Sequence, residues 1–343
     1  MNREQVTIKH IAKELGVSIS TVSRALSNNP LVKQQTREAI QKLAKEMNYH
    51  PNFTALSLRQ GKTRTIGLLI PQVVHEFFAQ VIRGIEDVAY NQGYNVLISS
   101  SNESFERELR NAEELLNGRI DGLLACITKE THTFEHFEEY INRQVPLVFF
   151  DCVTDTINTD KVVIDDLDAG FMATEHLIEQ GCKTLAFIGG PKDLNTNHER
   201  LLGFQKALKK HNLEETPRLI MHGTSGKYDE GLDLSKGLFN QEKKPDGVFA
   251  ATDMLGIGVM KNAKAAGLKI PDDVAIIGFS NWEIGEIFEP SLSTIDQKGY
   301  DIGKIATARL LERIDSDQEM SMMTEVIKTT LIARASSQRK TQK

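Results

Sequence analysis

The chain has 343 residues, of which 40% are hydrophobic and 26% are charged. This length predicts two or three domains, and the composition excludes a wholly disordered chain and a coiled-coil rod. The sequence has no apolar run of the roughly 18 residues that a membrane span needs. The polar start at Met1–Gln5 has no apolar stretch of signal-peptide length. We therefore expect a cytoplasmic protein that does not contact a membrane.

Three widely spaced cysteines, Cys126, Cys152 and Cys182, form no CxxC pair. An odd number of cysteines argues against a disulfide framework. Their neighbours are mainly apolar, so we interpret them as reduced core thiols rather than as metal ligands or nucleophiles. No motif predicts a metal or a cofactor.

The net charge of −6 hides an asymmetry along the chain. Residues 1–65 contain eleven Lys and Arg and four Asp and Glu, a net charge of +7, so the remainder carries −13. A small basic segment before a large acidic one suggests that only the first meets a polyanion. Solvated charge with no partner is the alternative, and charge alone does not decide between them.

The basic segment has the periodicity of three short helices. Apolar residues recur at helical spacing from Ile8 to Leu15, from Ile19 to Leu26 and from about Gln34 to Asn48. Gly16 suits the tight turn between the first two helices. About 45 residues arranged in this way predict an all-α helix-turn-helix head.

The second helix of this head has an outward face of short or forked side chains. Thr7 and Ser18 are placed to cap the first and second helices, and the exposed residues of the second are Ile19, Ser20, Thr21, Ser23 and Arg24. A helix enters the major groove only if its outward side chains allow close approach and some reach base edges. We favour DNA binding over a three-helix bundle without a DNA role.

The segment after the head has the features of a joint. Pro51 stops the third helix. The apolar segment Phe53–Arg59 is too short to be a stable isolated helix, but it can fold on docking. Gly61–Arg64 is typical of a linker.

From Thr65 onward apolar strands alternate with helices. The predicted strands are Ile66–Ile70, Asn95–Ser99, Gly122–Ile127, Pro146–Phe150, Val162–Ile164, Thr184–Ile188, Leu219–Met221, Gly247–Ala250 and Val274–Ile277. The predicted helices are Phe78–Asn91, Arg107–Leu116, Ala169–Glu179, Glu199–Lys210, Tyr228–Leu238 and Met254–Ala266. Such alternation indicates an α/β body of two doubly wound parallel-sheet lobes, with ligands bound beyond the carboxyl ends of the strands.

No enzyme signature accompanies this pattern. The sequence contains no GxGxxG, no Walker loop and no GxSxG elbow. His132 and His136 are four residues apart, but they lie in the acidic stretch Thr131–Tyr140, which we interpret as an exposed helix face rather than a metal pair. The sequence therefore predicts a protein that is not an enzyme.

Polar groups follow several predicted strands. Asp151, Asp165–Asp166, Asp253 and Ser280–Trp282 stand at strand ends, and Arg200 opens a helix. Carboxylates, a guanidinium and aromatic rings that converge on a cleft suit a polar small molecule with hydroxyl groups. For Asp165 and Asp253, capping of the next helix is an equally good interpretation.

Several stretches carry a resemblance to a known family. They are Val6–Leu26, Asn48–Asn52, Ile66–Pro71, Arg119–Leu124, Glu199–Phe204, Ile270–Phe279 and Leu331–Ser337. Together they span nearly the whole chain and closely resemble the LacI/GalR family of bacterial transcription regulators. The resemblance implies a homodimeric repressor of carbohydrate-metabolism genes that binds a palindromic DNA operator. Its body is then similar to a periplasmic sugar-binding protein.

The resemblance also implies roles for individual residues in DNA binding. Ile19, Ser20 and Arg24 match base-reading positions, and Leu58, with Ala55 beside it, matches a leucine wedged into the minor groove. The positions that match phosphate contacts are Ser18, Thr21, Ser23 and Asn52. The DNA-binding set is thus Thr7, Ser18, Ile19, Ser20, Thr21, Ser23, Arg24, Asn52, Ala55 and Leu58.

A second set of positions matches the family's ligand cleft. These are Phe77, Phe78, Asp151, Asp166, Arg200 and Asp253. Trp282, from the groups that follow predicted strands, completes the predicted ligand set. Ser280 stands where many members have Asp, which predicts a specificity different from that of purine or simple galactoside sensors. We expect Arg200→Ala to abolish ligand binding and to leave the stability of the free protein nearly unchanged.

The resemblance divides the chain as follows. The head is 1–49, the hinge helix and linker 50–64, the first lobe 65–161 with 293–322, the second lobe 162–292 with 323–336, and a polar tail 337–343. The tail has no heptad, so no tetramerising helix is expected. Two alternatives are a solute-binding receptor with an incidental head, and an enzyme of the Rossmann type. DNA binding by the isolated head and titration with nicotinamide cofactors distinguish them.

Overall fold

The computed structural model describes residues 6–49, 62–192, 194–316, 318 and 320–339. The chain forms two compact units, a head of residues 1–63 and a body of residues 64–343. In these described ranges no helix combines the length and the apolar character needed to cross a membrane.

The head contains three helices, as predicted. They are α1 (Ile8–Glu14), α2 (Ile19–Leu26) and α3 (Gln34–Glu46). Their inward faces form one apolar cluster in which Ile11, Val22 and Ile40 are fully buried. Gly16, between α1 and α2, has a φ of +62°, a conformation that glycine adopts without a steric penalty. The turn therefore fixes α2 across the other two helices.

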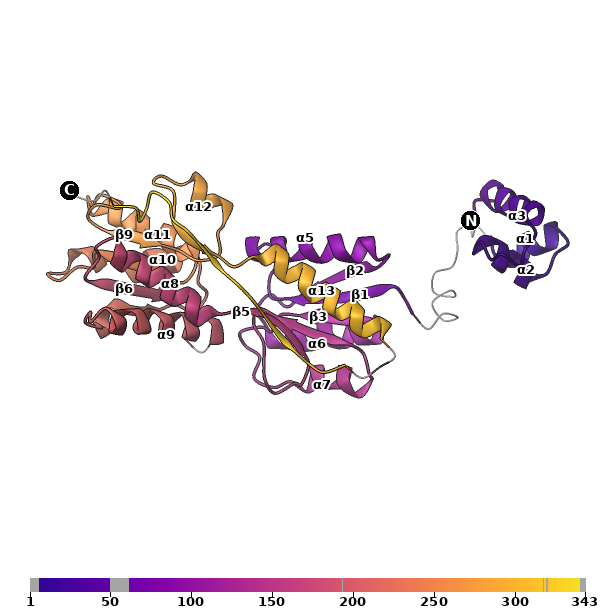
Figure 1. Ribbon diagram of the computed structural model, residues 1–343, viewed down its shortest axis with the longest axis horizontal. Helices are drawn as coiled ribbons and strands as arrows, with labels where there is room; N and C mark the ends of the chain where they lie inside the picture. Colours follow the sequence, from indigo (N-terminus) through magenta and orange to yellow (C-terminus); the bar gives the residue numbers. More distant parts are fainter. Residues whose placement is uncertain (1–5, 50–61, 193, 317, 319, 340–343) are drawn as a thin grey trace. The chain divides into compact units, whose positions relative to one another are not determined.

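The first lobe of the body is a six-stranded parallel sheet covered on both faces (Figure 1). Its strand order is β11-β5-β4-β3-β1-β2. Helices α5 and α13 cover one face, and α6 packs on the other with α7 beside it. The elements are β1 (Thr65–Ile70), α5 (Glu76–Asn91), β2 (Asn95–Ser100), α6 (Phe105–Asn117), β3 (Gly122–Ala125), α7 (Glu135–Asn142), β4 (Leu147–Phe150), β5 (Asp160–Ile164), α13 (Gly299–Asp315) and β11 (Thr324–Ile327).

The second lobe is a four-stranded parallel sheet of order β7-β6-β8-β9. Helices α8 and α9 cover one face, and α10 and α11 cover the other (Figure 1). The elements are α8 (Asp166–Glu179), β6 (Leu185–Gly189), α9 (Asn195–Lys210), η1 (Pro217–Leu219), β7 (Ile220–His222), α10 (Tyr228–Ser235), η2 (Leu238–Asn240), β8 (Gly247–Ala250), α11 (Asp253–Ala265), β9 (Ala275–Ile277) and α12 (Glu283–Ile287). The predicted pair of parallel-sheet lobes is confirmed.

Three segments of the described chain pass between the lobes. The first joins β5 to α8, and the other two include the antiparallel pair β10 (Thr294–Asp296) and β12 (Thr330–Ile332). Strand β5 pairs with β4 and β11 along its length. The expected lobe boundary between residues 161 and 162 therefore falls inside a strand of the first sheet. Residues 324–327, expected in the second lobe, pair with the first lobe as well.

The close approach of α8 and α9 depends on two glycines. A Cβ at Gly170 would lie 2.4 Å from the carbonyl oxygen of Arg200, and one at Gly203 would lie 2.2 Å from that of Leu167. Any side chain at these positions would push the helices apart. This tight contact fixes Arg200, at the second turn of α9, against the start of α8.

Most element boundaries lie within a few residues of the prediction, with informative exceptions. Helix α9 begins at Asn195, four residues before the predicted Glu199, and α10 ends at Ser235. The exposed-face interpretation is wrong for His136. Its side chain is buried in α7, and its Nε2 lies 3.1 Å from Oε1 of the buried Glu108. A buried carboxylate needs donors, and the histidine supplies one.

Candidate functional site

The outward face of α2 in the head carries the predicted DNA-contacting side chains. Ser18 caps the helix, as predicted, because its Oγ accepts a hydrogen bond from the Thr21 N–H at 3.2 Å. The Ser18 Oγ also lies 2.8 Å from Ser20 Oγ and 2.8 Å from Thr21 Oγ1. This hydroxyl cluster sits at a helix N-terminus, where unpaired N–H groups and the helix dipole favour an anion such as a phosphate.

The side chains predicted to read bases are accessible. Ile19 is 44% exposed, Ser20 and Arg24 are exposed, and the inward neighbours Val22 and Ala25 are fully buried. Thr7 is exposed at the start of α1, where its N–H donates to His10 Nδ1. The remaining predicted contacts, Asn52, Ala55 and Leu58, lie outside the described residues. DNA contact by each of these residues stays a prediction.

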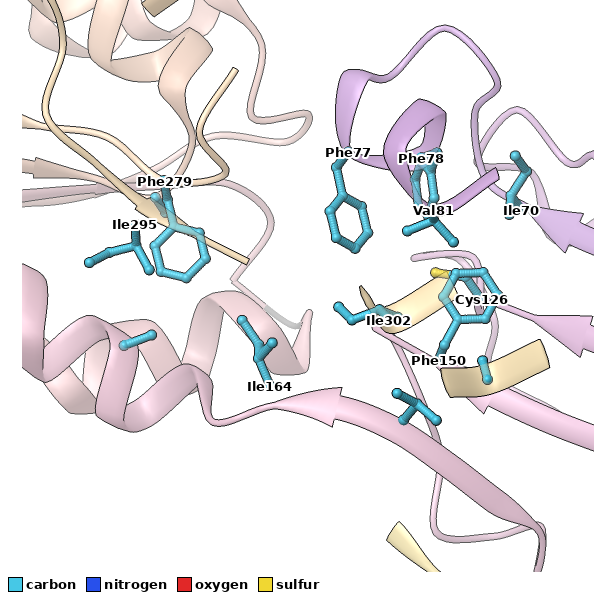
Figure 2. Packing of buried hydrophobic residues seen from close by; sticks show 14 of the residues in the cluster. Ile70, Phe77, Phe78, Val81, Cys126, Phe150, Ile164, Phe279, Ile295 and Ile302 are labelled. Atoms are coloured by element: carbon cyan, nitrogen blue, oxygen red, sulfur yellow. The ribbon is translucent and has the colours of Figure 1, made fainter. Parts of the chain in front are cut away.

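The body contains a cavity of about 400 Å³ where the two lobes meet. Five of the seven predicted ligand residues line it: Phe77, Phe78, Asp151, Arg200 and Trp282. The first three come from the first lobe, and Arg200 and Trp282 come from the second. Figure 2 shows Phe77 and Phe78 side by side on α5, and their ring centroids are 5.2 Å apart. The cavity therefore has walls from both lobes.

The other two predicted ligand residues do not line the cavity, so direct ligand contact is not supported for them. Asp166 accepts a 2.7 Å hydrogen bond from Arg200 Nε. Asp253 is almost fully buried and accepts 2.7 Å hydrogen bonds from the Trp282 N–H and the Thr294 hydroxyl. Through these contacts Asp253 holds the backbone at Trp282 in position beside the cavity. Capping is the role of Asp165, whose carboxylate accepts from the Asp168 N–H in the first turn of α8.

Arg200 is rigidly held at the cavity wall. Besides its ion pair with Asp166, Arg200 donates from Nη1 to the Ala251 carbonyl at 2.9 Å. Its guanidinium carbon lies 3.7 Å from the centroid of the Phe279 ring, a close cation–π contact. Only 5% of the residue is exposed. A cation fixed in this way at a cavity wall is suited to orient a polar ligand.

Burial changes the pKa of several groups in and beside the cavity. Burial, reinforced by the nearby Asp166 and opposed by Arg200, raises the pKa of Asp151 to about 6. Burial raises the pKa of Asp253 to about 6 as well, against the hydrogen bonds it accepts. Burial, together with the charge of Arg200, lowers the pKa of His75 to about 4, so this histidine is neutral near pH 7.

Sequence reasoning missed His75, the residue before α5. It lines the cavity, and its ring packs edge-on against Trp282 with the centroids 4.5 Å apart. Two buried polar atoms in this pair, His75 Nδ1 and Trp282 Nε1, have no hydrogen-bond partner among the described residues. Buried polar groups are normally satisfied. Both atoms are therefore candidates to bond a bound molecule. The position of His75 after strand β1 was the only available signal.

The loop after β9 takes an unusual backbone path. Ser280 and Asn281 have φ values of 108° and 55°, which side-chain-bearing residues rarely adopt. Hydrogen bonds hold the path, because the Ser280 N–H donates to the Ile295 carbonyl and Arg334 donates to Asn281 Oδ1. Ser280 and Trp282 both line the cavity. Other lining residues that were not predicted include Glu103, Lys129, Asn197, Tyr228 and Gln297.

The two parts of the chain define a class of protein. A helix-turn-helix head presents an exposed polar face, and a body of two parallel-sheet lobes surrounds a cavity lined by aromatic and polar side chains. This is the architecture of DNA-binding proteins that sense a small molecule.

Comparisons with known proteins identify the family. Residues 7–52 match the family described as bacterial regulatory proteins, lacI family. Residues 174–337 match the periplasmic binding protein-like domain. The chain is 34% identical over 313 residues to catabolite control protein A of Priestia megaterium, covering 91% of this chain and 93% of that protein. The chain belongs to the LacI family of bacterial regulatory proteins.

Solved structures with a similar fold cover 97% of the chain. The complex of the transcriptional regulator CelR with cellobiose matches with a TM-score of 0.73 and 26% identity, covering 97% of this chain and 100% of that chain. The Lac repressor dimer bound to operator and the anti-inducer ONPF matches with a TM-score of 0.86 and 23% identity, covering 97% and 99%.

Proposed function

We propose that this protein is a ligand-responsive transcriptional repressor that binds a palindromic operator as a homodimer. Its effector is a sugar or sugar derivative held in the cavity between the lobes. The observation that carries the proposal is the lining of this cavity, which combines aromatic rings with buried polar atoms lacking a partner among the described residues. Membership of the LacI family supports the part of the proposal that concerns DNA binding.

DNA recognition is assigned to the head. Ile19, Ser20 and Arg24 contact base edges in the major groove, where the Arg24 guanidinium is suited to a guanine. Ser18, Thr21, Ser23 and Asn52 contact phosphates, with Thr7 at the start of α1. Leu58, with Ala55, enters the minor groove at the centre of the operator and helps to bend the duplex.

A mobility-shift titration on a palindromic operator tests this assignment. Arg24→Ala is expected to weaken specific binding by about 1–3 kcal/mol, with a smaller effect on unrelated DNA. Leu58→Ala is expected to do the same through the loss of the wedge. Glu38→Ala in α3 is a matched control outside both contact sets, and its operator affinity should stay near that of the wild type. Equal losses on operator and unrelated DNA would contradict base reading, and an affinity independent of salt would exclude phosphate contact.

The cavity chemistry favours a carbohydrate effector. Indole Nε1 of Trp282 is a donor only, so its partner must be an acceptor such as a hydroxyl or ring oxygen. The rings of Phe77, Phe78 and Trp282 offer apolar surfaces for the C–H face of a sugar. A carbohydrate also occupies a structural relative, since CelR was solved with cellobiose.

A ligand screen by thermal shift tests the effector class. Neutral sugars, uronates, phosphorylated sugars and purine bases form the panel, and we expect stabilisation by a member of the sugar classes. Trp282→Phe keeps an aromatic ring and removes the Nε1 donor, so it should weaken that ligand about tenfold, the effect of one lost hydrogen bond. Stabilisation by a purine base alone would overturn the carbohydrate assignment.

Ligand and DNA affinities should be linked. The ligand contacts both lobes, so it favours one inter-lobe arrangement. The coupling free energy between the ligand site and the DNA site is expected to be about 1–3 kcal/mol, and it must be reciprocal. Operator affinity measured with and without the ligand, and ligand affinity measured with and without operator, should change by the same factor.

A further inference from the structure

Two thiols and a carboxylate converge beside the cavity, outside the pairs already described. They are Cys126, Asp151 and Cys152, here called the thiol cluster. Each contributes one atom, and the three atoms all lie within 4.8 Å of one another. All three cysteines of the chain are free thiols, including Cys182, which lies apart from the cluster.

The parallel sheet brings these residues together. Strands β3 and β4 are neighbours, with Ala125 paired to Phe149, and the cluster residues follow directly after the two strands. Side chains normally alternate between the faces of a strand. Asp151 has a φ of 60°, which interrupts this alternation and lets Asp151 and Cys152 both reach Cys126.

The two carboxylate–sulfur distances match the coordination geometry of a small thiophilic cation. The Asp151 Oδ2 lies 3.7 Å from the Cys126 Sγ and 3.7 Å from the Cys152 Sγ. Around a tetrahedral Zn²⁺, with metal–sulfur and metal–oxygen bonds of about 2.3 Å and 2.0–2.2 Å, sulfur and oxygen ligands are separated by about 3.5 Å. The two sulfur atoms lie within 4.8 Å of each other, against about 3.8 Å around such an ion, so binding brings them closer by at most about 1 Å.

The backbone around the cluster is already fixed. The Cys126 N–H donates to the Leu69 carbonyl at 2.9 Å, and the Ile127 N–H donates to the Cys152 carbonyl at 3.0 Å. Figure 2 shows Cys126 close to Phe150 among the packed side chains of the first lobe. A pre-positioned set of ligands lowers the entropic cost of binding.

The cluster is connected to solvent through the cavity. Cys126 is 1% exposed, whereas Asp151 and Cys152 line the cavity wall. Three protein ligands leave one tetrahedral position open, as in zinc sites that accept a water or an exogenous ligand. Arg200 lies on the same wall and supplies a positive charge near the cluster. Two thiolates, one carboxylate and M²⁺ carry a net charge of −1, and the guanidinium, although it also pairs with Asp166, makes this charge less unfavourable.

We propose that Cys126, Asp151 and Cys152 form a binding site for one thiophilic divalent cation, of which Zn²⁺ is the reference, with its open coordination position facing the cavity. Soft thiolate ligands select such ions over Mg²⁺ and Ca²⁺. Binding replaces two S–H bonds by two S–M bonds and releases two protons, with no change in oxidation state. The metal site goes beyond the function proposed above and does not rest on it, because metal binding is measured without DNA or effector.

A cobalt titration of the full-length protein tests the site. The protein is stripped of metal, kept reduced with a phosphine and titrated with Co²⁺. We expect one equivalent to produce the near-ultraviolet sulfur-to-cobalt charge-transfer absorption, and Zn²⁺ to displace it. Cys126→Ser and Cys152→Ser should each weaken Co²⁺ binding at least tenfold. Cys182→Ser is the matched control and should bind as the wild type does.

A second measurement uses only the wild-type protein, so it does not depend on whether the variants fold. One equivalent of Zn²⁺ should slow alkylation of Cys152 at least tenfold, as followed by mass spectrometry of the labelled peptide. Absorption that persists in the Cys126→Ser/Cys152→Ser variant, or alkylation that Zn²⁺ does not slow, would overturn the site. A protein mass lower than that of the fully reduced chain by two hydrogen atoms, measured under reducing conditions, would also overturn the site, because Cys126 and Cys152 would then form a disulfide.

Discussion

Arg200→Ala separates the two roles that the structure gives to this side chain. Arg200 lines the cavity, and it also neutralises Asp166, with Nε 2.7 Å from Asp166 Oδ1. The side chains of the pair are only 6% and 11% exposed. Truncation therefore removes a ligand contact and leaves a carboxylate without its partner in a poorly solvated position.

The cost follows from the burial of the pair. Removing one partner of a buried ion pair costs about 3–5 kcal/mol, because the remaining charge keeps its desolvation penalty. The Ala251 carbonyl also loses its donor. For a body of this size the loss corresponds to a melting temperature lower by roughly 10 °C. The structure thus replaces the sequence-based expectation that the free protein would be nearly unaffected.

Urea unfolding of the body, followed by circular dichroism, measures this cost. The informative control is the double variant Arg200→Met/Asp166→Leu, which substitutes an apolar pair. It should recover most of the stability while still failing to bind ligand, because a paired apolar replacement carries no orphaned charge. A loss below about 1 kcal/mol for Arg200→Ala, with no recovery in the double variant, would refute the argument from burial.

Three further outcomes are expected. Ser18→Ala removes the N-cap of α2 and should cost the head about 1 kcal/mol, measured by thermal melting, with Ser27→Ala as a control at the other end of the helix. Asp151 has a pKa raised from 3.8 to about 6, so the folded state binds more protons and stability falls as pH rises between these values. Asp151→Asn should remove the Asp151 share of this decline, about 3 kcal/mol in urea unfolding at pH 4 and pH 7, and leave the share of Asp253, whose pKa is also raised to about 6. Burial raises the pKa of Glu230, but hydrogen bonds from the Thr224 hydroxyl and from the backbone N–H groups of Thr224, Ser225 and Gly226 outweigh it and lower the pKa to about 2. Glu230→Gln should cost about 1–2 kcal/mol at pH 7, and the difference should shrink as pH falls toward 2, where the wild-type carboxylate is protonated.

The head was predictable because its signals are local. Helical periodicity, a serine cap and a glycine turn lie within twenty residues of each other, and each corresponds to one observed feature of α1 and α2. The same holds for the parallel strands of the body, since runs such as Leu147–Phe150 are apolar throughout and fully buried. Local sequence carries such information directly.

The parts that depend on distant residues were not predictable. Strand β11 pairs with β5, although more than 150 residues separate Thr324 from Lys161 in the sequence. The buried position of His136 depends on Glu108, which lies on another helix. Asp253 illustrates the limit at the site itself, because its two donors come from the loop after β9 and from β10. The sequence correctly placed Asp253 after a strand, but it did not show which donors would form hydrogen bonds with this carboxylate.

Contacts between the lobes explain why a molecule in the cavity should change the body as a whole. Lys129 Nζ of the first lobe donates to the Thr224 carbonyl of the second at 3.3 Å, and the Glu283 N–H donates to Glu76 Oε1 at 2.6 Å. Both hydrogen bonds are exposed to solvent, so each contributes little to fixing the inter-lobe arrangement. A ligand that bonds groups on both cavity walls adds several contacts of the same kind. Under the proposed function, the occupant of the cavity would shift the equilibrium between inter-lobe arrangements by the difference in its affinity for them.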